Sequence, residues 1–171
     1  MRASIVALRD QGACAMRLMT ILFLTLLLAG CGQAQVKDRT VEVATNDAAV
    51  NAAMKEARAS LPQFFAKAAD PQPGTEAYAL KVKVEDKNGV EHFWVTPFSK
   101  TDDGFTGVIN NEAAVVEKVS LGEPYAFTAD EISDWMYVQN GKIHGGYTIR
   151  AMLPSMPKEE AAQYQALLAD Q

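Results

Sequence analysis

The chain has 171 residues, which is enough for one ordinary domain and not for two. Hydrophobic residues make up 49% of it and charged residues 22%, which excludes disordered, collagen-like and coiled-coil proteins. With 16 basic and 21 acidic residues the formal net charge is −5, so the chain lacks the bulk positive charge that binds a phosphate backbone, and no nucleic acid partner is expected.

The first thirty residues are predicted to be a bacterial export signal. Arg17 precedes an uncharged run over residues 18–28, which as a helix is too short to cross the ~30 Å hydrocarbon core of a membrane. The run leads into residues 28–31 (Leu-Ala-Gly-Cys), which resemble a lipoprotein processing site. Small residues there give access to the peptidase, and the following thiol carries the lipid. We therefore expect removal of residues 1–30 and a lipid anchor at Cys31.

Lipid attachment would leave the mature chain without a free thiol. The other cysteine, Cys14, lies in the leader, whether translation starts at Met1 or at Met16. A disulfide framework, a cysteine metal site and a cysteine nucleophile are therefore not expected. Without the leader, 13 basic and 20 acidic residues remain, a net charge of −7.

The residue after the cysteine indicates the membrane to which the lipoprotein is sent. In the lipoproteins that this signal resembles, aspartate at that position favours retention in the inner membrane. This chain has Gly32 there, which indicates the outer membrane, facing the periplasm.

The mature chain is expected to have three parts. Residues 31–45 are polar and show no clear period, which is typical of a flexible tether. Residues 46–153 carry the patterns of a folded domain. Residues 154–171 form a C-terminal tail, in which Pro157 begins a short helix.

The domain is predicted to begin with an amphipathic helix. Apolar residues recur at spacings of three and four from Val50 to Ala68, and Asn46 or Asp47 can cap the start. Pro62 removes an internal hydrogen bond, so the helix is expected to kink or restart there. Its polar face is not strongly basic, which favours packing against a core over lying on a membrane surface.

Strands are predicted after this helix because the apolar period changes to two. Residues 78–84 alternate between apolar and polar side chains. Asn88-Gly89 favours a type I′ turn into a second strand, which Pro97 would end. A two-residue turn at this dipeptide would pair Glu85 with His92.

The rest of the domain is also predicted to be mainly strands. Residues 112–121 fit a short helix or an extended chain equally, and a second hairpin is expected around Asn140-Gly141. The further strands are at residues 105–109, 124–128, 135–138 and 142–153, with a polar loop at 99–104. The predicted fold class is α+β, with the N-terminal helix packed on a mainly antiparallel sheet of about five or six strands and a short C-terminal helix.

Five short segments of the domain follow one another in an order that is typical of a bacterial family. They are Glu91–Val95, Phe105–Asn111, Ser133–Tyr137, Asn140–Lys142 and Gly145–Arg150. Together with the helix before them, these segments resemble the YegJ-like proteins, domain of unknown function 2314, over about residues 46–153. Many relatives have proline where this chain has Glu112. The resemblance implies an α+β domain, often in a small secreted or lipid-anchored protein, and no established activity.

Adjacent glycines in the second hairpin indicate a close approach of another group to the backbone. Gly145 and Gly146 would weaken a strand unless something occupies the space that their missing side chains leave. The occupant is either a ligand or Trp135 from the same domain, and internal packing is the favoured reading. The expected register also places His144 on the same face as Tyr137.

The charged residues of the hairpins allow a structural and a catalytic interpretation. Asp134 and Arg150 on neighbouring strands would form an ion pair, or act as a general base and an anion clamp. His92 beside Glu85 gives a base and an orienting carboxylate, but no motif places a serine or cysteine nucleophile there. His92 and His144 lack the close ligand spacing of a zinc site, so no metal is expected, and no phosphate or dinucleotide motif indicates a cofactor.

These patterns favour a non-catalytic binding module for an envelope protein, a peptide or a small ligand. The candidate binding face consists of His92, Trp94, Asp134, Trp135, Tyr137, His144, Gly145, Gly146 and Arg150. The alternative is a hydrolase or transferase. It would require at least three of four side chains to converge in one pocket, namely His92, Asp134, His144 and Arg150.

Overall fold

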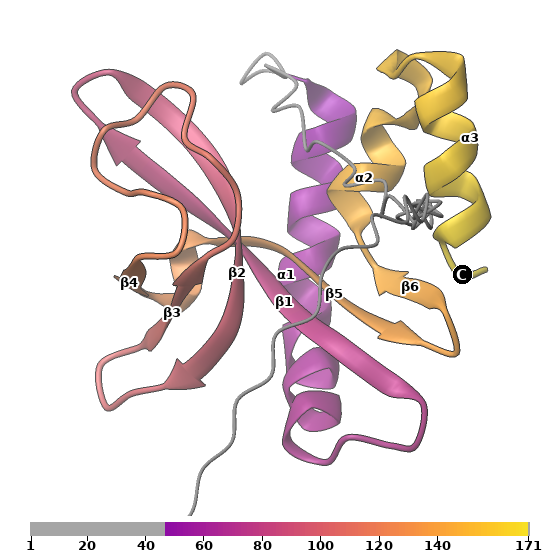
Figure 1. The fold of residues 1–171 in the computed structure, drawn as a ribbon, viewed down its shortest axis with the longest axis horizontal. Coiled ribbons are helices and arrows are strands. Elements are labelled where there is room, and N and C mark those ends of the chain that lie inside the picture. The colour runs from indigo at the N-terminus through magenta and orange to yellow at the C-terminus, as the bar shows by residue number, and fades with distance from the viewer. Residues whose placement is uncertain (1–46, 171) are drawn as a thin grey trace, which may run out of the picture. The chain divides into compact units, whose positions relative to one another are not determined.

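The computed structural model describes residues 47–170, so the predicted signal, Cys31 and the tether lie outside the described residues. Helix α1 (Ala48–Ala69) precedes a six-stranded antiparallel sheet, and two short helices follow the last strand (Figure 1). The predicted α+β fold, with its N-terminal helix, antiparallel sheet and C-terminal helix, is confirmed.

The sheet places the two hairpins side by side, with β6 of the second hairpin at one edge. Its strand order is β4-β3-β2-β1-β5-β6, so β1 pairs with both β2 and β5. The strands are β1 (Thr75–Asp86), β2 (Gly89–Lys100), β3 (Phe105–Ile109), β4 (Pro124–Phe127), β5 (Ile132–Gln139) and β6 (Lys142–Gly145). The remaining elements are α2 (Tyr147–Met152), α3 (Lys158–Leu167) and single 3₁₀ turns, η1 (Ala129–Glu131) and η2 (Leu153–Ser155).

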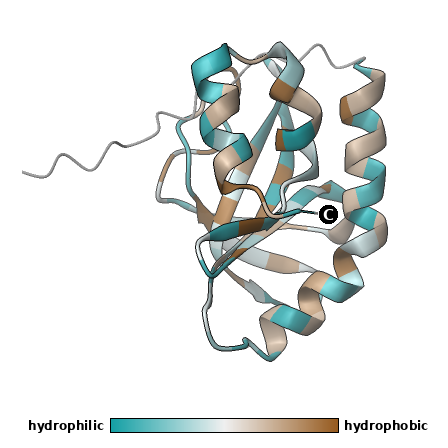
Figure 2. Ribbon diagram, turned by 90° about the vertical axis from the view of Figure 1, so that its right-hand side faces the viewer, coloured by the Kyte–Doolittle hydropathy of each residue, from teal (hydrophilic) through white to brown (hydrophobic). Residues whose placement is uncertain are grey.

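Helix α1 is amphipathic and continuous. The carboxylate of Asp47 caps it by accepting hydrogen bonds from two backbone N–H groups of the first turn, at 2.8 and 3.2 Å. The helix runs through Pro62, so the predicted restart is wrong. Leu61 and Phe64, on either side of the proline, are buried against the sheet, and this packing outweighs the one lost hydrogen bond. Figure 2 shows the hydrophilic and hydrophobic bands that alternate along α1.

Apolar side chains cover both faces of the sheet. The larger cluster joins α1 to the sheet and contains Phe64, Val82, Phe93, Ile109 and Trp135, among others. The smaller cluster contains Ala79, Trp94, Ile149 and Leu168, and so involves α2 and the end of α3. Neighbouring strand residues point to opposite faces, which is why one strand contributes to both clusters.

The first hairpin turns one residue earlier than predicted. Asp86 pairs with Gly89, so the turn residues are Lys87 and Asn88. The Asp86 carboxylate accepts the N–H of Asn88 at 2.8 Å, a local side-chain turn that fixes this arrangement. Each side chain keeps its predicted face, but every cross-strand pair changes, including the pair that contains His92.

Strand β2 is longer than expected. It continues through Pro97 to Lys100, so the predicted end at Pro97 is wrong, and the loop predicted from residue 99 begins only after residue 100. The β2–β3 register is irregular between the pairs of Val95 and Phe98, and a residue without a backbone N–H is tolerated in such an interruption of the ladder.

The second hairpin has the predicted turn and register, but its second strand is short. Asn140 and Gly141 have φ angles of 51° and 75°, as a type I′ turn requires. Strand β6 ends at Gly145, so the predicted strand as far as residue 153 is wrong. Gly145 and Gly146 have φ angles of 78° and 62°, and this left-handed pair turns the chain out of the sheet into α2.

Candidate functional site

The residues of the predicted binding face do not lie on one surface. Trp94 packs with Ala79 and Leu168 in the smaller cluster. Trp135 and Tyr137 are buried in the larger cluster, on the other side of the sheet. The pleat of the strands separates these aromatic residues, so they do not line a common concave face.

The close approach at the paired glycines is made by Trp135. A Cβ atom at Gly145 would clash with the Trp135 carbonyl oxygen and lie 2.5 and 2.6 Å from two carbons of its indole ring. The indole Nε1 donates hydrogen bonds to the Ala57 carbonyl at 3.1 Å and to Ser60 Oγ at 3.0 Å. Of the two expected occupants, the tryptophan therefore fills this space, and it ties β5 to α1.

Asp134 holds the start of α2. Its fully buried carboxylate accepts the backbone N–H groups of Trp135 at 2.8 Å, Tyr147 at 3.2 Å and Thr148 at 2.7 Å. It also accepts the Thr148 hydroxyl at 2.6 Å. Burial raises the pKa of the Asp134 carboxyl, and the hydrogen bonds from Thr148 partly oppose this rise. The side chain is enclosed by its partners, which suits a structural anchor.

Arg150 stabilises the C-terminal segment, and the predicted ion pair with Asp134 is wrong. Arg150 lies on α2 instead of a strand, and donates hydrogen bonds to the carbonyls of Gly145 at 3.1 Å and Ala169 at 2.8 Å. The last residues of the chain are thereby attached to β6, where the Ala169 N–H also donates to the Ile143 carbonyl at 2.9 Å.

His92 is held by a serine. Its pairing partner is Lys83, so the predicted neighbour Glu85 is wrong. The His92 Nδ1 atom lies 2.8 Å from Ser133 Oγ, and the Ser133 hydroxyl donates to the Lys81 carbonyl at 3.2 Å. When the Ser133 hydroxyl donates its one proton to the Lys81 carbonyl, its oxygen accepts the hydrogen of His92 Nδ1. Ser133 is fully buried, which makes it unsuited to act as a nucleophile.

The environment of His92 predicts a pH-dependent stability. Burial, followed by the charges of Lys81, Lys83 and Arg58, lowers the pKa of His92 to about 4. Below pH 6.5 the unfolded chain binds this proton and the folded chain does not, so the free energy of unfolding falls by roughly 3 kcal/mol between pH 6.5 and pH 4. Urea unfolding at several pH values measures the slope. The His92→Gln variant is expected to flatten this slope. A His92 pKa near 6.5 by NMR would contradict the prediction.

The four side chains of the enzymatic alternative have separate intramolecular partners. His92 contacts Ser133, and Asp134 binds the start of α2. His144 stacks on Tyr137, with ring centroids 4.9 Å apart and planes 6° apart, on the face that the register predicted. Within residues 47–170, no three His, Cys, Asp or Glu side chains are grouped so that they could hold a metal ion.

A long loop connects β3 to β4 over residues 110–123, and we call it the β3–β4 loop. It contains neither a helix nor a strand. Loops of this length without regular structure are uncommon in compact domains and are usually functional or disordered. Its start is fixed on β2: the Asn110 N–H donates to the Trp94 carbonyl at 2.8 Å, and the Asn111 side-chain oxygen accepts the Trp94 N–H at 2.9 Å.

The middle of the β3–β4 loop is held by a buried carboxylate. Glu91 on β2 is 3% exposed and accepts the backbone N–H groups of Ala114 at 2.9 Å, Val115 at 2.9 Å and Val116 at 3.2 Å. Glu91 is not among the site residues predicted from the sequence. The signal was present, because the period of two places this glutamate on the same core-facing side of its strand as Phe93.

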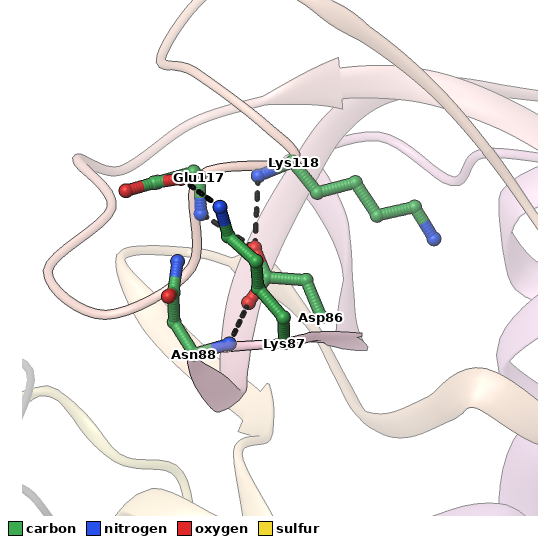
Figure 3. A network of polar contacts seen from close by, with 5 residues as sticks. All are labelled: Asp86, Lys87, Asn88, Glu117 and Lys118. Carbon is green, nitrogen blue, oxygen red and sulfur yellow. Dashed lines mark hydrogen bonds and ion pairs between the residues drawn. The ribbon is translucent and has the colours of Figure 1, made fainter.

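A second carboxylate holds the next residues of the loop. Asp86 accepts the backbone N–H groups of Glu117 at 2.7 Å and Lys118 at 3.2 Å, while Lys87 forms an ion pair with Glu117 at 3.4 Å (Figure 3). Hydrogen bonds from the backbone of Asn88, Glu117 and Lys118 lower the pKa of Asp86. Asp86 thus shapes the hairpin turn and holds the loop with the same side chain.

Together, the two carboxylates bind five consecutive N–H groups, those of residues 114–118. Val116 and Val119 are buried in the larger cluster, which seats the loop on the core. Val115 and Leu121, in contrast, are 39% and 47% exposed. The loop is therefore held in one conformation while it presents apolar side chains to solvent, an arrangement that can bind without paying for loop ordering.

No helix within residues 47–170 combines the length and apolar character that crossing a membrane requires.

Comparison with known proteins identifies the family. A bacterial family described as "Uncharacterized protein conserved in bacteria (DUF2314)" matches residues 47–169. The chain is 34% identical over 149 residues to the uncharacterized protein YegJ of Escherichia coli K12, which covers 86% of this chain and 96% of that protein. It is 39% identical over 82 residues to a putative ankyrin repeat protein of Neisseria meningitidis serogroup B, covering 48% of this chain and 32% of that protein. No solved structure matches the chain. The chain thus belongs to the DUF2314 family of uncharacterised bacterial proteins, as its hairpin segments predicted.

Proposed function

We propose that this protein is a lipoprotein of the bacterial cell envelope, anchored at Cys31 in the outer membrane and facing the periplasm, whose domain binds a protein partner without catalysis. The β3–β4 loop is the proposed contact surface. The observation that carries the proposal is the pair of carboxylates, Asp86 and Glu91, which hold five consecutive N–H groups of an otherwise irregular loop.

The proposed location rests on the leader. Three features together match a lipoprotein signal: the uncharged run, the small residues before Cys31, and Cys31 as the single thiol of the mature chain. Several lipid chains would make such an anchor effectively permanent, because each buried methylene contributes ~0.8 kcal/mol.

The proposed binding role rests on two observations: the β3–β4 loop is held in place, and the polar side chains of the enzymatic alternative form hydrogen bonds inside the domain. His92, Asp134 and Arg150 are engaged in internal hydrogen bonds that hold strands, a helix start and the C-terminal segment. A loop that is ordered in advance loses little conformational entropy when a partner binds. The relative named as an ankyrin repeat protein supports a modular role, because the matching stretch is only 32% of that protein.

The proposal is tested by site-specific photo-cross-linking in the cells that produce the protein. A benzophenone amino acid at position 115 or 121 is expected to form an adduct of defined mass with one partner. The same amino acid at position 167, where Leu167 is 44% exposed on α3, is the control and is expected to form none. Glu91→Gln, which removes the charge that holds the loop, is expected to reduce the adduct at position 115.

The anchor is tested in the same preparation by intact mass. The mature chain is expected to begin at Cys31 and to carry the lipid, and the Cys31→Ser variant is expected to lack it. Absence of an adduct at positions 115 and 121, or equal adducts at position 167, would refute the proposed contact surface. A chain that retains its leader and has no lipid would refute the location.

A further inference from the structure

We propose that a polar hollow beside the outer edge of β6 binds a neutral sugar ring. The hollow is lined by the β5–β6 hairpin and the C-terminal segment, so this site is a second one beside the protein contact proposed for the β3–β4 loop. The proposal is drawn from a column of stacked rings that ends at the hollow, and from polar side chains there that form no hydrogen bond inside the domain.

The hollow lies where the C-terminal segment runs beside β6. Leu168 forms a parallel bridge with Ile143, and the Ala169 N–H donates to the Ile143 carbonyl at 2.9 Å. The volume of the hollow is about 390 Å³, which falls within the range of about 300–1,000 Å³ that is usual for small-molecule sites. Its lining includes Gln139, Lys142, His144, Ala169 and Asp170.

Three stacked rings cross the sheet toward this hollow. Tyr78 on β1 stacks on Tyr137 on β5 with ring centroids 5.3 Å apart, and Tyr137 stacks on His144 on β6 at 4.9 Å. The next position across the sheet is that of Ala169, because the parallel bridge beside β6 places it opposite His144. Alanine has no ring, so the column ends at His144, and the hollow that both residues line takes the place of a fourth ring.

The polar side chains around the hollow are available to a ligand. Within residues 47–170, no hydrogen bond or ion pair involves the side chains of Gln139, His144 or Asp170. The Lys142 ammonium donates to the Ala166 carbonyl at 2.6 Å, which leaves its other hydrogens for a ligand. An amide, an imidazole, a carboxylate and an ammonium thus offer both donors and acceptors at the end of the ring column.

These groups favour a neutral ring that carries hydroxyl groups. Each hydroxyl both donates and accepts, so it can pair with the carboxylate or the amide and also with the ammonium. Lys142 and Asp170 have opposite charges, so the pair favours neither sign of charge on a ligand. The C–H groups of a sugar ring carry a small positive charge and pack on the negative face of an aromatic ring such as His144.

A heteroaromatic ring fits the same place less well. It would also stack on His144, but most of its polar atoms either donate or accept. It would therefore use fewer of the four polar side chains than a sugar does.

The experiment is an NMR titration of the full mature chain with Cys31→Ser. Methyl glucoside, whose ring cannot open, is expected to bind with a dissociation constant in roughly the millimolar range, as the size of one sugar ring allows. The largest shifts are expected at the His144 ring and the Ala169 methyl group. Sorbitol has the hydroxyl groups without the ring, so we expect it to bind about ten-fold more weakly. Glucuronate, glucosamine and adenosine are also expected to bind more weakly than the glucoside.

Variants test the hollow and the ring separately. Ala169→Leu fills the hollow and is expected to weaken glucoside binding about ten-fold or more. Ala162→Leu adds the same side chain at an exposed position of α3 and is expected to leave binding unchanged. His144→Phe keeps a ring that stacks, so it is expected to bind the glucoside at least about three-fold more tightly than His144→Ala. Each variant is first shown to retain the circular dichroism of the parent.

Several outcomes would overturn the proposal. They are no saturable binding of the glucoside, equal binding of sorbitol, tighter binding of a charged sugar or of adenosine, and shifts centred away from His144 and Ala169. Unchanged binding by Ala169→Leu, or equal binding by the two His144 variants, would also overturn it. None of these outcomes bears on the β3–β4 loop, because photo-cross-linking tests the protein contact at other residues.

Discussion

Replacing Gly145 with alanine is expected to destabilise the domain by more than about 4 kcal/mol, a large share of the roughly 5–15 kcal/mol that stabilises a typical domain. The added methyl group would collide with the carbonyl oxygen and the indole ring of Trp135. That ring is fixed by hydrogen bonds to α1 and by stacking on Phe64 at a centroid distance of 5.2 Å, so it cannot move away cheaply. Urea unfolding followed by tryptophan fluorescence measures the loss.

Gly141→Ala is the matched control for this substitution. Gly141 has a φ angle of 75°, close to the 78° of Gly145, but a Cβ atom there would meet nothing within 4 Å. It therefore reports only the cost of a left-handed backbone, about 1–2 kcal/mol. The difference between the two variants isolates the clash with Trp135, and equal losses would contradict the packing described here.

Replacing Asp134 with alanine is expected to cost about 3–5 kcal/mol of unfolding free energy. The substitution removes one carboxylate that accepts three backbone N–H groups and a hydroxyl, and it leaves the buried N–H groups of Trp135 and Thr148 without partners. Because Asp134 joins β5 to the start of α2, the loss should also loosen α2. Amide hydrogen exchange over residues 147–152 is expected to accelerate even where the sheet stays protected.

Two milder changes serve as controls for Asp134. Thr148→Ala removes only the hydroxyl bond and is expected to cost about 1 kcal/mol. Asp134→Asn keeps one acceptor oxygen and removes the charge that burial disfavours, so its loss should lie between the other two. If Asp134→Ala cost no more than Thr148→Ala, the carboxylate would not be the anchor of α2.

Local patterns were enough to predict most of the helices and strands. The spacing of apolar residues along α1 and the alternation in β1 depend on residues that are close in the chain, and both are confirmed. The turn at Asn140-Gly141 is confirmed for the same reason, since its two positive φ angles are a preference of these residues themselves.

The errors arise where a distant or competing side chain decides the backbone. Asn88-Gly89 has the same preference for a turn, but the carboxylate of Asp86 moves the turn back by one residue. Residues 147–149 (Tyr-Thr-Ile) favour a strand by composition, yet they begin α2, because two left-handed glycines leave the sheet and Asp134 from another strand binds the first N–H groups.

The candidate site was less predictable than the fold. The residues chosen from the sequence were aromatic, charged or glycine, and the structure uses most of them to hold the core and its helices. The β3–β4 loop was left open between helix and extended chain. Its conformation depends on Glu91 and Asp86, which lie 23–25 and 31–32 residues from the N–H groups that they bind.

The amino-acid sequence alone was sufficient for the family, the α+β class and the turn of the second hairpin, because these follow from composition, short motifs and the local period of apolar residues. The exported, lipid-anchored chain stays a prediction from the leader. Only the tertiary structure decided that Trp94 and Trp135 pack on opposite sides of the sheet, what fills the space beside Gly145, and how the β3–β4 loop is held. Those features depend on buried hydrogen bonds and close packing between segments far apart in the chain, which no local pattern encodes.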